Sequence, residues 1–347
     1  MLRVHRAPIC QSQAGAKSRV KLVLHLNDFS WPVAPEQLGS TLTGIAQAGE
    51  SAGFDSIAVM DHLWQHPMMG GPEKPVLECY AALTWIAAQT SRIGLVALAT
   101  AASYRPAGLL AKMVTSLDVL SGGRAWLGIG AGDYEEEARG LGVPYPSPAD
   151  RFAILEETIQ VCLQMWGGEH GSDQPFTGKH VHLERSLNLP QSLSRPHPPI
   201  LIAGSGEQRT LRLVARYGDA CNIRPGPEIP HKLDVLRRHC ETEDRDFDAI
   251  ERTCPFLFDV GEDGSKAGEL VAQLRGLAQM GMQKVFGRVV GDYQIRPIEI
   301  MGREVIPAAH SSLPHSMRAA RTTPPVGSPA GLTKKKSERF GDHSAGC

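Results

Sequence analysis

Short apolar segments alternate with amphipathic segments along most of the chain. Segments that are apolar throughout predict strands at residues 20–26, 54–60, 93–99, 124–129, 199–203, 219–223, 255–260 and 284–290. Apolar residues at helical spacing follow each of them, most clearly in residues 148–166, where Phe152, Leu155 and Ile159 fall on one face. Strands without polar alternation are typical of parallel sheets that are covered on both faces.

Eight such strand–helix units over about 290 residues predict an α/β fold of the (β/α)8 TIM-barrel type. An open, doubly wound sheet gives a similar alternation and is the alternative fold. Residues 167–199 interrupt the alternation with a Gly-, His- and Pro-rich stretch that has room for only a short hairpin. We interpret this stretch as an insertion that could form a lid over a site.

The two ends of the chain differ in composition from the predicted barrel domain at residues 20–307. Residues 1–19 contain basic residues, no acidic residue and no apolar periodicity, so we expect a disordered leader, with a targeting peptide as the alternative. Pro, Ser, Gly and basic residues dominate residues 308–347, and Lys334–Lys336 is a run of positive charge. This composition predicts a disordered tail rather than a nucleic-acid-binding segment.

Charge and cysteine content narrow the expected partners and the compartment. The net charge of −1 provides no electrostatic footprint for nucleic acid or for a membrane surface. No apolar run approaches the ~20 residues of a membrane-spanning helix. The 7 cysteines are scattered and never spaced as C-x-x-C, which favours reduced thiols over a disulfide scaffold or a zinc ribbon. We therefore expect a cytoplasmic protein that binds a small-molecule substrate, with no nucleic-acid partner and no membrane partner.

Residues 120–137 read LSGGRAWLGIGAGDYEEE and combine a turn, a strand, a glycine-rich loop and the acidic start of a helix. The dinucleotide pattern G-x-G-x-x-G fails in both registers that the glycines allow, because Asp133 and Glu135 stand where the third glycine is required. The glycines still free the backbone for close approach to a ligand. They predict a cofactor site without identifying the cofactor.

Polar residues follow the predicted strands at the positions where a TIM barrel binds its ligands. These positions are Asn27–Asp28, Asp61–His62, Thr100, Gly130–Asp133, Gly204–Glu207 and Asn222. His62 can give or take a proton near neutral pH, which makes it the candidate general acid or base. Two other interpretations stay open: a loop histidine preceded by a capping Asp61, or a metal site built from Asp61, His62 and His66.

Gly204-Ser205-Gly206 lies between a predicted strand and a predicted helix. Exposed backbone amides and the positive end of the helix dipole suit such a turn to phosphate, and TIM barrels commonly bind phosphate after their late strands. An ordinary tight turn is the alternative. Trp64 falls beside His62 in a loop, so we expect it to line a substrate pocket.

The chain from about residue 20 to residue 307 resembles the luciferase-like flavin oxidoreductase family, in particular its actinobacterial, deazaflavin-dependent branch. The likeness is carried by GFDSIAVMDH at 53–62, YRPAGLLAKM at 104–113, LDVLSGGR at 117–124, GIGAG at 128–132 with EEE at 135–137, and PPILIAGSGE at 198–207 with TLRLVAR at 210–216. Each segment alone is weakly specific. Their common order and spacing identify the family.

The resemblance implies a barrel in which the deazaflavin coenzyme F420, or FMN, lies across the strand ends. His62 matches a family histidine that faces the reactive ring. Leu98, Ala99 and Thr100 match a place where relatives often have a bulge with a non-prolyl cis peptide. The residues expected to bind the cofactor are Asp61, Leu98, Ala99, Thr100, Gly130, Ala131, Gly132, Gly204, Ser205 and Gly206. Relatives also suggest a homodimer.

We therefore expect an F420-dependent oxidoreductase that moves a hydride between C5 of the deazaflavin and a small organic substrate, with no metal. His62 would move the accompanying proton. Asp133, which matches a glutamate of sugar-phosphate dehydrogenases in the family, would take the opposite protonation role. Ala102 replaces a common asparagine and so removes one expected hydrogen bond. The alternatives are an FMN-dependent monooxygenase, a metal-dependent TIM-barrel hydrolase and a non-catalytic cofactor carrier.

Overall fold

The computed structural model describes residues 20–168 and 171–310 of the chain. The predicted leader at 1–19 and the predicted tail from residue 311 onward therefore lie outside the described residues. In the described ranges, no helix is long and apolar enough to cross a membrane.

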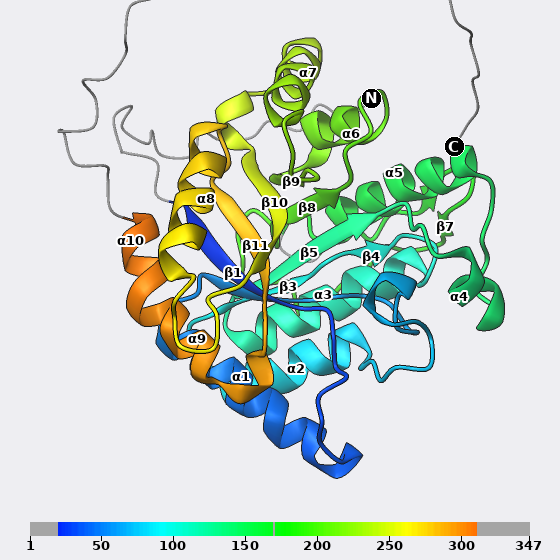
Figure 1. Cartoon of the computed structure of the whole chain (residues 1–347). Helices are drawn as coiled ribbons and strands as arrows, with labels where there is room; N and C mark the ends of the chain where they lie inside the picture. The colour runs from blue at the N-terminus through cyan, green and yellow to red at the C-terminus, as the bar shows by residue number, and fades with distance from the viewer. Residues whose placement is uncertain (1–19, 169–170, 311–347) are drawn as a thin grey trace, which may run out of the picture. The chain divides into compact units, whose positions relative to one another are not determined.

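The strands close into one parallel barrel, and the predicted TIM barrel is confirmed (Figure 1). Within the described residues, the eight strands around the barrel are β1 (Lys21–Leu26), β2 (Ser56–Val59), β3 (Gly94–Ala97), β5 (Ala125–Gly130), β8 (Ile200–Ala203), β9 (Ala220–Asn222), β10 (Glu251–Phe258) and β11 (Lys284–Val289). Pairing of β1 with β11 and of β3 with β5 closes the circle. The two residues of β4 (Thr100–Ala101) continue the third strand and pair with β5.

Helices surround the barrel (Figure 1). In the described ranges they are α1 (Leu38–Ala52), α2 (Cys79–Gln89), α3 (Ala107–Ser121), α4 (Glu135–Gly140), α5 (Pro148–Met165), α6 (Thr210–Tyr217), α7 (Ile229–Thr242), α8 (Ala267–Gln279), α9 (Arg296–Ile300), a π-helical stretch (Met301–Val305) and α10 (Ile306–His310). Gly53 ends α1 and Gly122 ends α3, both at positive φ (90° and 75°), which is a common helix stop because glycine has no Cβ to clash.

Successive strand residues point to opposite sides of the barrel wall. Val23, Ala58, Val96, Leu201 and Phe286 form a buried cluster inside the barrel. Their neighbours along the strands pack outward against the helices in a larger core. Both faces of each strand are therefore apolar, which explains the absence of polar alternation in the sequence.

A buried lysine lies at the amino-terminal end of the barrel. The ammonium group of Lys284, on β11, lies 2.9 Å from carboxylate oxygens of both Asp55 and Glu251. The same group lies 4.3 Å from the centre of the Trp126 ring. Because Lys284 is only 1% exposed, this network takes the place of an apolar residue at that end of the barrel.

The structure moves two predicted boundaries. Strand β10 begins at Glu251, earlier than the predicted start at Pro255, and proline inside a strand normally removes a hydrogen bond. Strand β10 tolerates Pro255 because β9 pairs with β10 only as far as Thr253. The amide hydrogen that Pro255 lacks is therefore not needed for pairing with β9. At the other boundary, the helix that begins with α9 continues through His310, beyond the predicted domain end at residue 307.

The insertion packs against the outer helices α3 and α5, and its interpretation as a lid stays a prediction. It contains the predicted short hairpin, β6 (Phe176–Thr177) paired antiparallel with β7 (His182–Leu183). Asn188 donates to the Thr115 hydroxyl at 3.1 Å, and Ser194 donates to Asp118 at 2.7 Å. Thr115 and Asp118 belong to the carboxyl-terminal half of α3, whereas Leu183 of the hairpin lies against Gly108 in the first turn of that helix.

Candidate functional site

A cis peptide marks the end of the third strand. The Leu98–Ala99 bond is cis and not prolyl, as the family resemblance predicts for this place. Beyond it the Thr100 hydroxyl, which is fully buried, donates to Asp61 at 2.7 Å and accepts from the Tyr80 hydroxyl at 2.9 Å. The ends of β2 and of the third strand are thereby fixed to one another.

Asp61 lies in a buried ion pair with Arg105. The guanidinium donates to both carboxylate oxygens of Asp61, at 2.7 and 2.9 Å, and to Glu78 at 2.5 Å. Burial lowers the pKa of Arg105, but the hydrogen bonds that it donates to Asp61, together with the negative charge of that carboxylate, outweigh burial and raise the pKa. Thus Asp61 orients the strand end that precedes His62, and its contact with a cofactor stays a prediction.

The candidate acid or base, His62, is held by a buried carboxylate. His62 Nδ1 lies 2.7 Å from Glu137 Oε2, and the Glu137 side chain is fully buried. Glu137 also accepts from the amide of Leu63 and, at 3.0 Å, from the hydroxyl of Tyr104. Burial raises the pKa of the Glu137 carboxyl, but these hydrogen bonds more than offset it and hold that pKa below its ordinary value. Glu137 therefore stays ionised and fixes the imidazole, leaving Nε2 for a ligand.

Sequence reasoning missed the role of Glu137. It assigned the carboxylate partner of the chemistry to Asp133, which is exposed and has no hydrogen bond to His62. In the sequence, Glu137 is one of three consecutive glutamates at the predicted start of a helix. Helical spacing could have distinguished Glu137 from its neighbours. Glu137 lies three residues after Tyr134 and directly before Ala138, so it falls on the buried face of α4, whereas Glu135 and Glu136 fall on the exposed face.

Two further rings accompany His62. The ring centre of His66 lies 5.2 Å from His62 and 5.3 Å from Tyr134. Burial and the neighbouring His62 lower the pKa of His66. The Tyr134 hydroxyl is buried without a hydrogen-bond partner among the described residues, which is the signature of a position that a ligand completes.

The hydrogen bonds of the candidate ligands Asp61 and His66 do not support a metal site. The Asp61 carboxylate is turned to Arg105, and His66 Nδ1 accepts from the Met68 amide at 3.2 Å. Among residues 20–168 and 171–310 no group of three His, Cys, Asp or Glu side chains is arranged to hold a metal ion.

Trp64 lies against the end of α4. A Cβ placed on Gly140 would come within 2.1 Å of the Trp64 ring, so glycine is required there. The Trp64 amide donates to Glu137 at 3.3 Å. The ring is therefore positioned beside the His62–Glu137 pair, and its role in a substrate pocket stays a prediction.

Glycines bring β5 close to the third strand. A Cβ on Gly128 would lie 2.0 Å from the carbonyl oxygen of Ala97, and one on Gly132, whose φ is +78°, would lie 3.0 Å from the Cβ of Ala101. Ala102, the departure from the family pattern, donates through its amide to the carbonyl of Gly130 at 3.0 Å. Thus Gly130, Ala131 and Gly132 lie at the strand ends, next to the cis peptide.

The predicted phosphate turn follows β8, which pairs with β5 and lies opposite β1 in the barrel. Gly204, at φ +124°, and Gly206 both face the side chain of Thr210, the first residue of α6. The Ser205 hydroxyl accepts from the Arg224 amide at 2.8 Å, which ties the turn to the end of β9. Strand β8, which leads into this turn, is four strands from β1 in either direction around the barrel.

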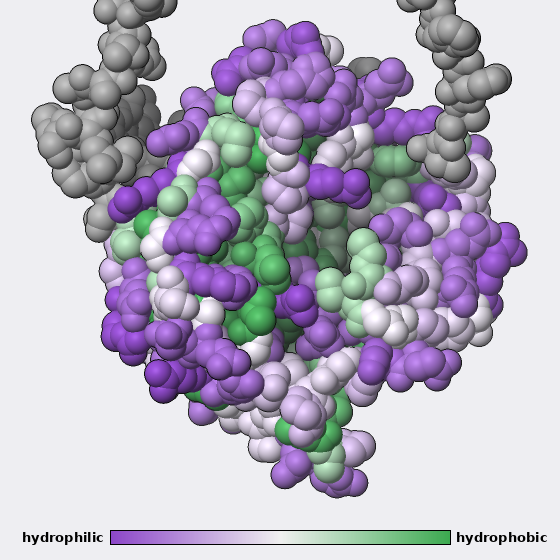
Figure 2. Space-filling view, in the orientation of Figure 1, coloured by the Kyte–Doolittle hydropathy of each residue, from purple (hydrophilic) through white to green (hydrophobic). Residues whose placement is uncertain are grey.

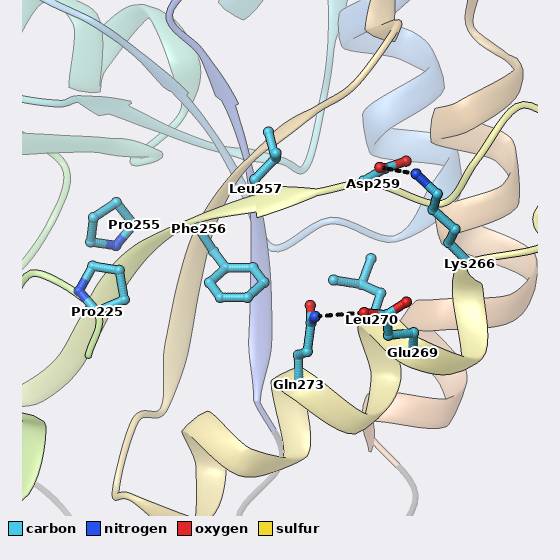
Figure 3. A pocket seen from close by; sticks show the side chains of 9 residues that line it. All are labelled: Pro225, Pro255, Phe256, Leu257, Asp259, Lys266, Glu269, Leu270 and Gln273. Carbon is cyan, nitrogen blue, oxygen red and sulfur yellow. Dashed lines mark hydrogen bonds and ion pairs between the residues drawn. The ribbon is translucent and has the colours of Figure 1, made fainter. Parts of the chain in front are cut away.

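A separate cavity of about 630 Å³ lies between β10 and α8. Figure 3 shows the Phe256 ring directed toward α8, whereas Leu257, on the same strand, points the other way. An ion pair between Asp259 and Lys266 lies at one end, with 2.5 Å between oxygen and nitrogen. In the surface view, hydrophobic residues gather in a band across this face (Figure 2). None of the site residues predicted from the sequence lines this cavity.

Comparison with known proteins identifies the family. A family model described as luciferase-like monooxygenase matches residues 22–339. The chain belongs to this family. The resemblance expected from the sequence is thereby confirmed, and the luciferase-like family makes the protein an oxidoreductase.

Two luciferase-like relatives are named F420-dependent glucose-6-phosphate dehydrogenase. The protein of Kineococcus radiotolerans is 30% identical over 237 residues, which is 66% of this chain and 66% of the relative. The protein of Beutenbergia cavernae is 30% identical over 249 residues, 68% of this chain and 69% of the relative. The match thus spans about two thirds of each relative's own length.

Solved structures share the luciferase-like fold. An F420-dependent secondary alcohol dehydrogenase in complex with an F420–acetone adduct superposes with a TM-score of 0.69 and 16% identity, over 84% of this chain and 100% of the other. Monooxygenase RslO1 from Streptomyces bottropensis gives a TM-score of 0.69 and 17% identity, over 83% and 99%. At these identities the likeness concerns the fold alone.

Proposed function

We propose that this luciferase-like protein is an F420-dependent oxidoreductase that transfers a hydride between the deazaflavin and a small organic substrate. The names of the relatives support the choice of F420. The residues present fit such a group: Gly204 and Gly206 are exposed at the turn where a phosphate would be held, and the Tyr134 ring, whose buried hydroxyl has no partner among the described residues, lies 5.8 Å from the His62 ring. Leu98–Thr100 and Gly130–Gly132 would line the ring. Bound F420 would supply two-electron hydride chemistry.

The hydrogen bond between His62 and Glu137 is the observation that carries this function. With Nδ1 fixed by an ionised carboxylate, Nε2 of His62 can hold or release the proton that balances hydride transfer to or from a carbonyl or alcohol. Tyr104 and the backbone at Leu63 prevent Glu137 from turning away. Asp133, at the exposed start of the α4 region, would take the second protonation role.

Separate titrations of the purified protein with F420 and with FMN, followed by fluorescence, test the choice of cofactor. We expect the dissociation constant for F420 to be at least tenfold lower than that for FMN. Tighter binding of FMN would favour the monooxygenase alternative. A His62→Ala variant should keep its F420 affinity and lose most turnover, whereas a non-catalytic carrier would show no turnover in the wild-type protein either.

We also propose a homodimer that works in the cytoplasm on a small-molecule substrate. A groove between α2 and α3 is lined by Trp85, Met113 and Leu120, and Leu120 is 71% exposed. An apolar groove of this kind suits a second copy of the chain. The 5 described cysteines are free and buried, which agrees with a reducing compartment. Light scattering should give the mass of a dimer.

A further inference from the structure

Unpartnered polar atoms gather at one side of the barrel mouth, where β1 and β11 end. His25 Nε2 and Asn27 Oδ1 are both buried and have no hydrogen-bond partner among the described residues. Buried polar atoms are normally paired, because leaving one unpaired costs about 1–3 kcal/mol. Two such atoms on one strand end indicate that a ligand completes them.

Arg288 belongs to the same place. Val23 and Phe286 are paired and point into the barrel, so the residues two positions further along, His25 and Arg288, point inward side by side. Among the described residues, no hydrogen bond is formed by the guanidinium of Arg288, and its nearest carboxylate oxygen, on Asp28, lies 3.6 Å away. Its donors are therefore open to a ligand.

The position of His25, Asn27 and Arg288 suits them to contact the substrate rather than the phosphate of the cofactor. Strand β1 is paired with β2, which leads to His62, and lies opposite β8, which leads to the Gly204–Gly206 turn. A phosphate held at that turn is thus on the far side of the mouth. A substrate whose reacting carbon lies near His62 can extend over the ends of β1 and β11.

The charges around Arg288 disfavour an anion. Two carboxylates, Asp28 and Asp292, lie close to this single guanidinium. His25 contributes no positive charge at neutral pH, because burial and the neighbouring Arg288 lower its pKa to about 4. A dianionic phosphate requires a surplus of positive charge, whereas a hydroxyl group, which both donates and accepts, matches a mixture of open donors and acceptors.

We propose that His25, Asn27 and Arg288 form a subsite that binds an uncharged, hydroxylated part of the substrate. This proposal rests on the proposed function, which places the reacting end of the substrate near His62. The subsite separates this protein from relatives named for a phosphorylated sugar, because its charge balance selects an alcohol, a polyol or the corresponding carbonyl compound over a phosphate ester or a carboxylate.

Two matched series of probes test the subsite on the F420-loaded protein. One series is glucose, glucuronate and glucose 6-phosphate, and the other is glycerol, glycerate and glycerol 3-phosphate. Within each series the carbon skeleton stays similar and the charge changes. We expect the uncharged member to bind at least tenfold more tightly than the charged members in at least one series, measured by calorimetry or ligand-observed NMR. Tightest binding of the phosphorylated members, or no preference in either series, would overturn the proposal.

Variants test whether the subsite residues cause the preference for the uncharged probe. Arg288→Gln and Asn27→Leu should each weaken binding of the uncharged probe about tenfold and leave the F420 dissociation constant within twofold of wild type. Arg303→Gln, which changes an exposed arginine paired with Glu304, is the matched control and should change neither. If Arg288→Gln fails to fold, Asn27→Leu gives the same test. Unchanged probe binding in a folded variant overturns the subsite, whereas a wild-type protein that does not bind F420 overturns the proposed function instead.

Discussion

At the scale of single residues, the site depends on which carboxylate contacts His62. Asp133 and Glu137 are both acidic and lie within one short segment, yet only Glu137 is buried and bonded to the imidazole. The sequence places acidic residues after β5 and a histidine after β2. It could not tell which acid turns inward, because that depends on how α4 packs against the loop that follows β2.

Replacing Glu137 by glutamine tests its positioning role. The amide keeps the size of the side chain but removes the charge that fixes the Nδ1 proton of His62, so we expect kcat to fall by about 10- to 100-fold. The F420 dissociation constant should change less than twofold. The control is Glu136→Gln on the exposed face of the same helix, which should behave as wild type. Wild-type kcat in Glu137→Gln would contradict the role, and Asp133→Asn in parallel would show whether Asp133 takes part at all.

Asp292 makes the stability depend on pH in a defined direction. Burial raises the pKa of its carboxyl from 3.8 to about 6, and Asp28 adds to the effect. Between these values the folded protein holds a proton that the unfolded chain releases, so this group's contribution to stability decreases as pH rises, by about 3 kcal/mol at most. Below pH 3.8 the contribution is constant because both states are protonated.

The Asp292→Asn variant should therefore gain stability relative to wild type as pH rises from 4 to 6, and keep that gain above pH 6. Urea denaturation at several pH values measures the difference in unfolding free energy. Asp248→Asn, at a position 82% exposed, should show no such trend. A difference between Asp292→Asn and wild type that is independent of pH would refute the assignment.

At the scale of elements, the sequence located most strands and the ends at which ligands bind. It missed the early start of β10, because Pro255 and the charged residues before it interrupt the apolar run. Composition also indicates that residues 167–199 are an insertion, but only tertiary contacts such as the hydrogen bonds of Asn188 and Ser194 to α3 show which elements it packs against.

The turn after β8 can be tested with a matched pair of substitutions. Gly204→Ala places a Cβ at positive φ, 3.2 Å from the Thr210 side chain, whereas Gly53→Ala places one at positive φ with nothing within 4 Å. Each should cost about 1–2 kcal/mol of stability for the left-handed backbone. Only Gly204→Ala should also weaken F420 binding, about tenfold in a fluorescence titration. Equal F420 affinity in the two variants would argue for an ordinary turn.

At the scale of the whole molecule, closure of the barrel places residues from the two ends of the described domain side by side. Lys284 meets Asp55 at one end of the barrel, and Arg288 meets His25 at the other. Because strands β1 and β11 pair only when the circle closes, no local pattern in the sequence records these neighbours. The polar network at Lys284 also replaces an apolar layer that the strand pattern would suggest.

Lys284→Met should destabilise the protein. Removing the ammonium group leaves the largely buried carboxylates of Asp55 and Glu251 without their closest partner, at a cost of about 3 kcal/mol. Lys21→Met is the control: its side chain is 52% exposed and contacts the same carboxylates at longer distance, so the loss should stay below about 1 kcal/mol. Urea denaturation with an unchanged m-value measures both. Equal losses would contradict the central position of Lys284.

The sequence by itself predicted the strand–helix units of a barrel, the family and the strand ends that carry His62 and the Gly204–Gly206 turn. These features are local: apolar periodicity defines strands and helices, and motifs occur in a fixed order along the chain. Only the tertiary structure decided that Glu137 rather than Asp133 contacts His62, that Asp61 pairs with Arg105, and that His25, Asn27 and Arg288 share one side of the mouth. Those contacts join segments far apart in the sequence, and packing selects them from several residues of the same chemical type.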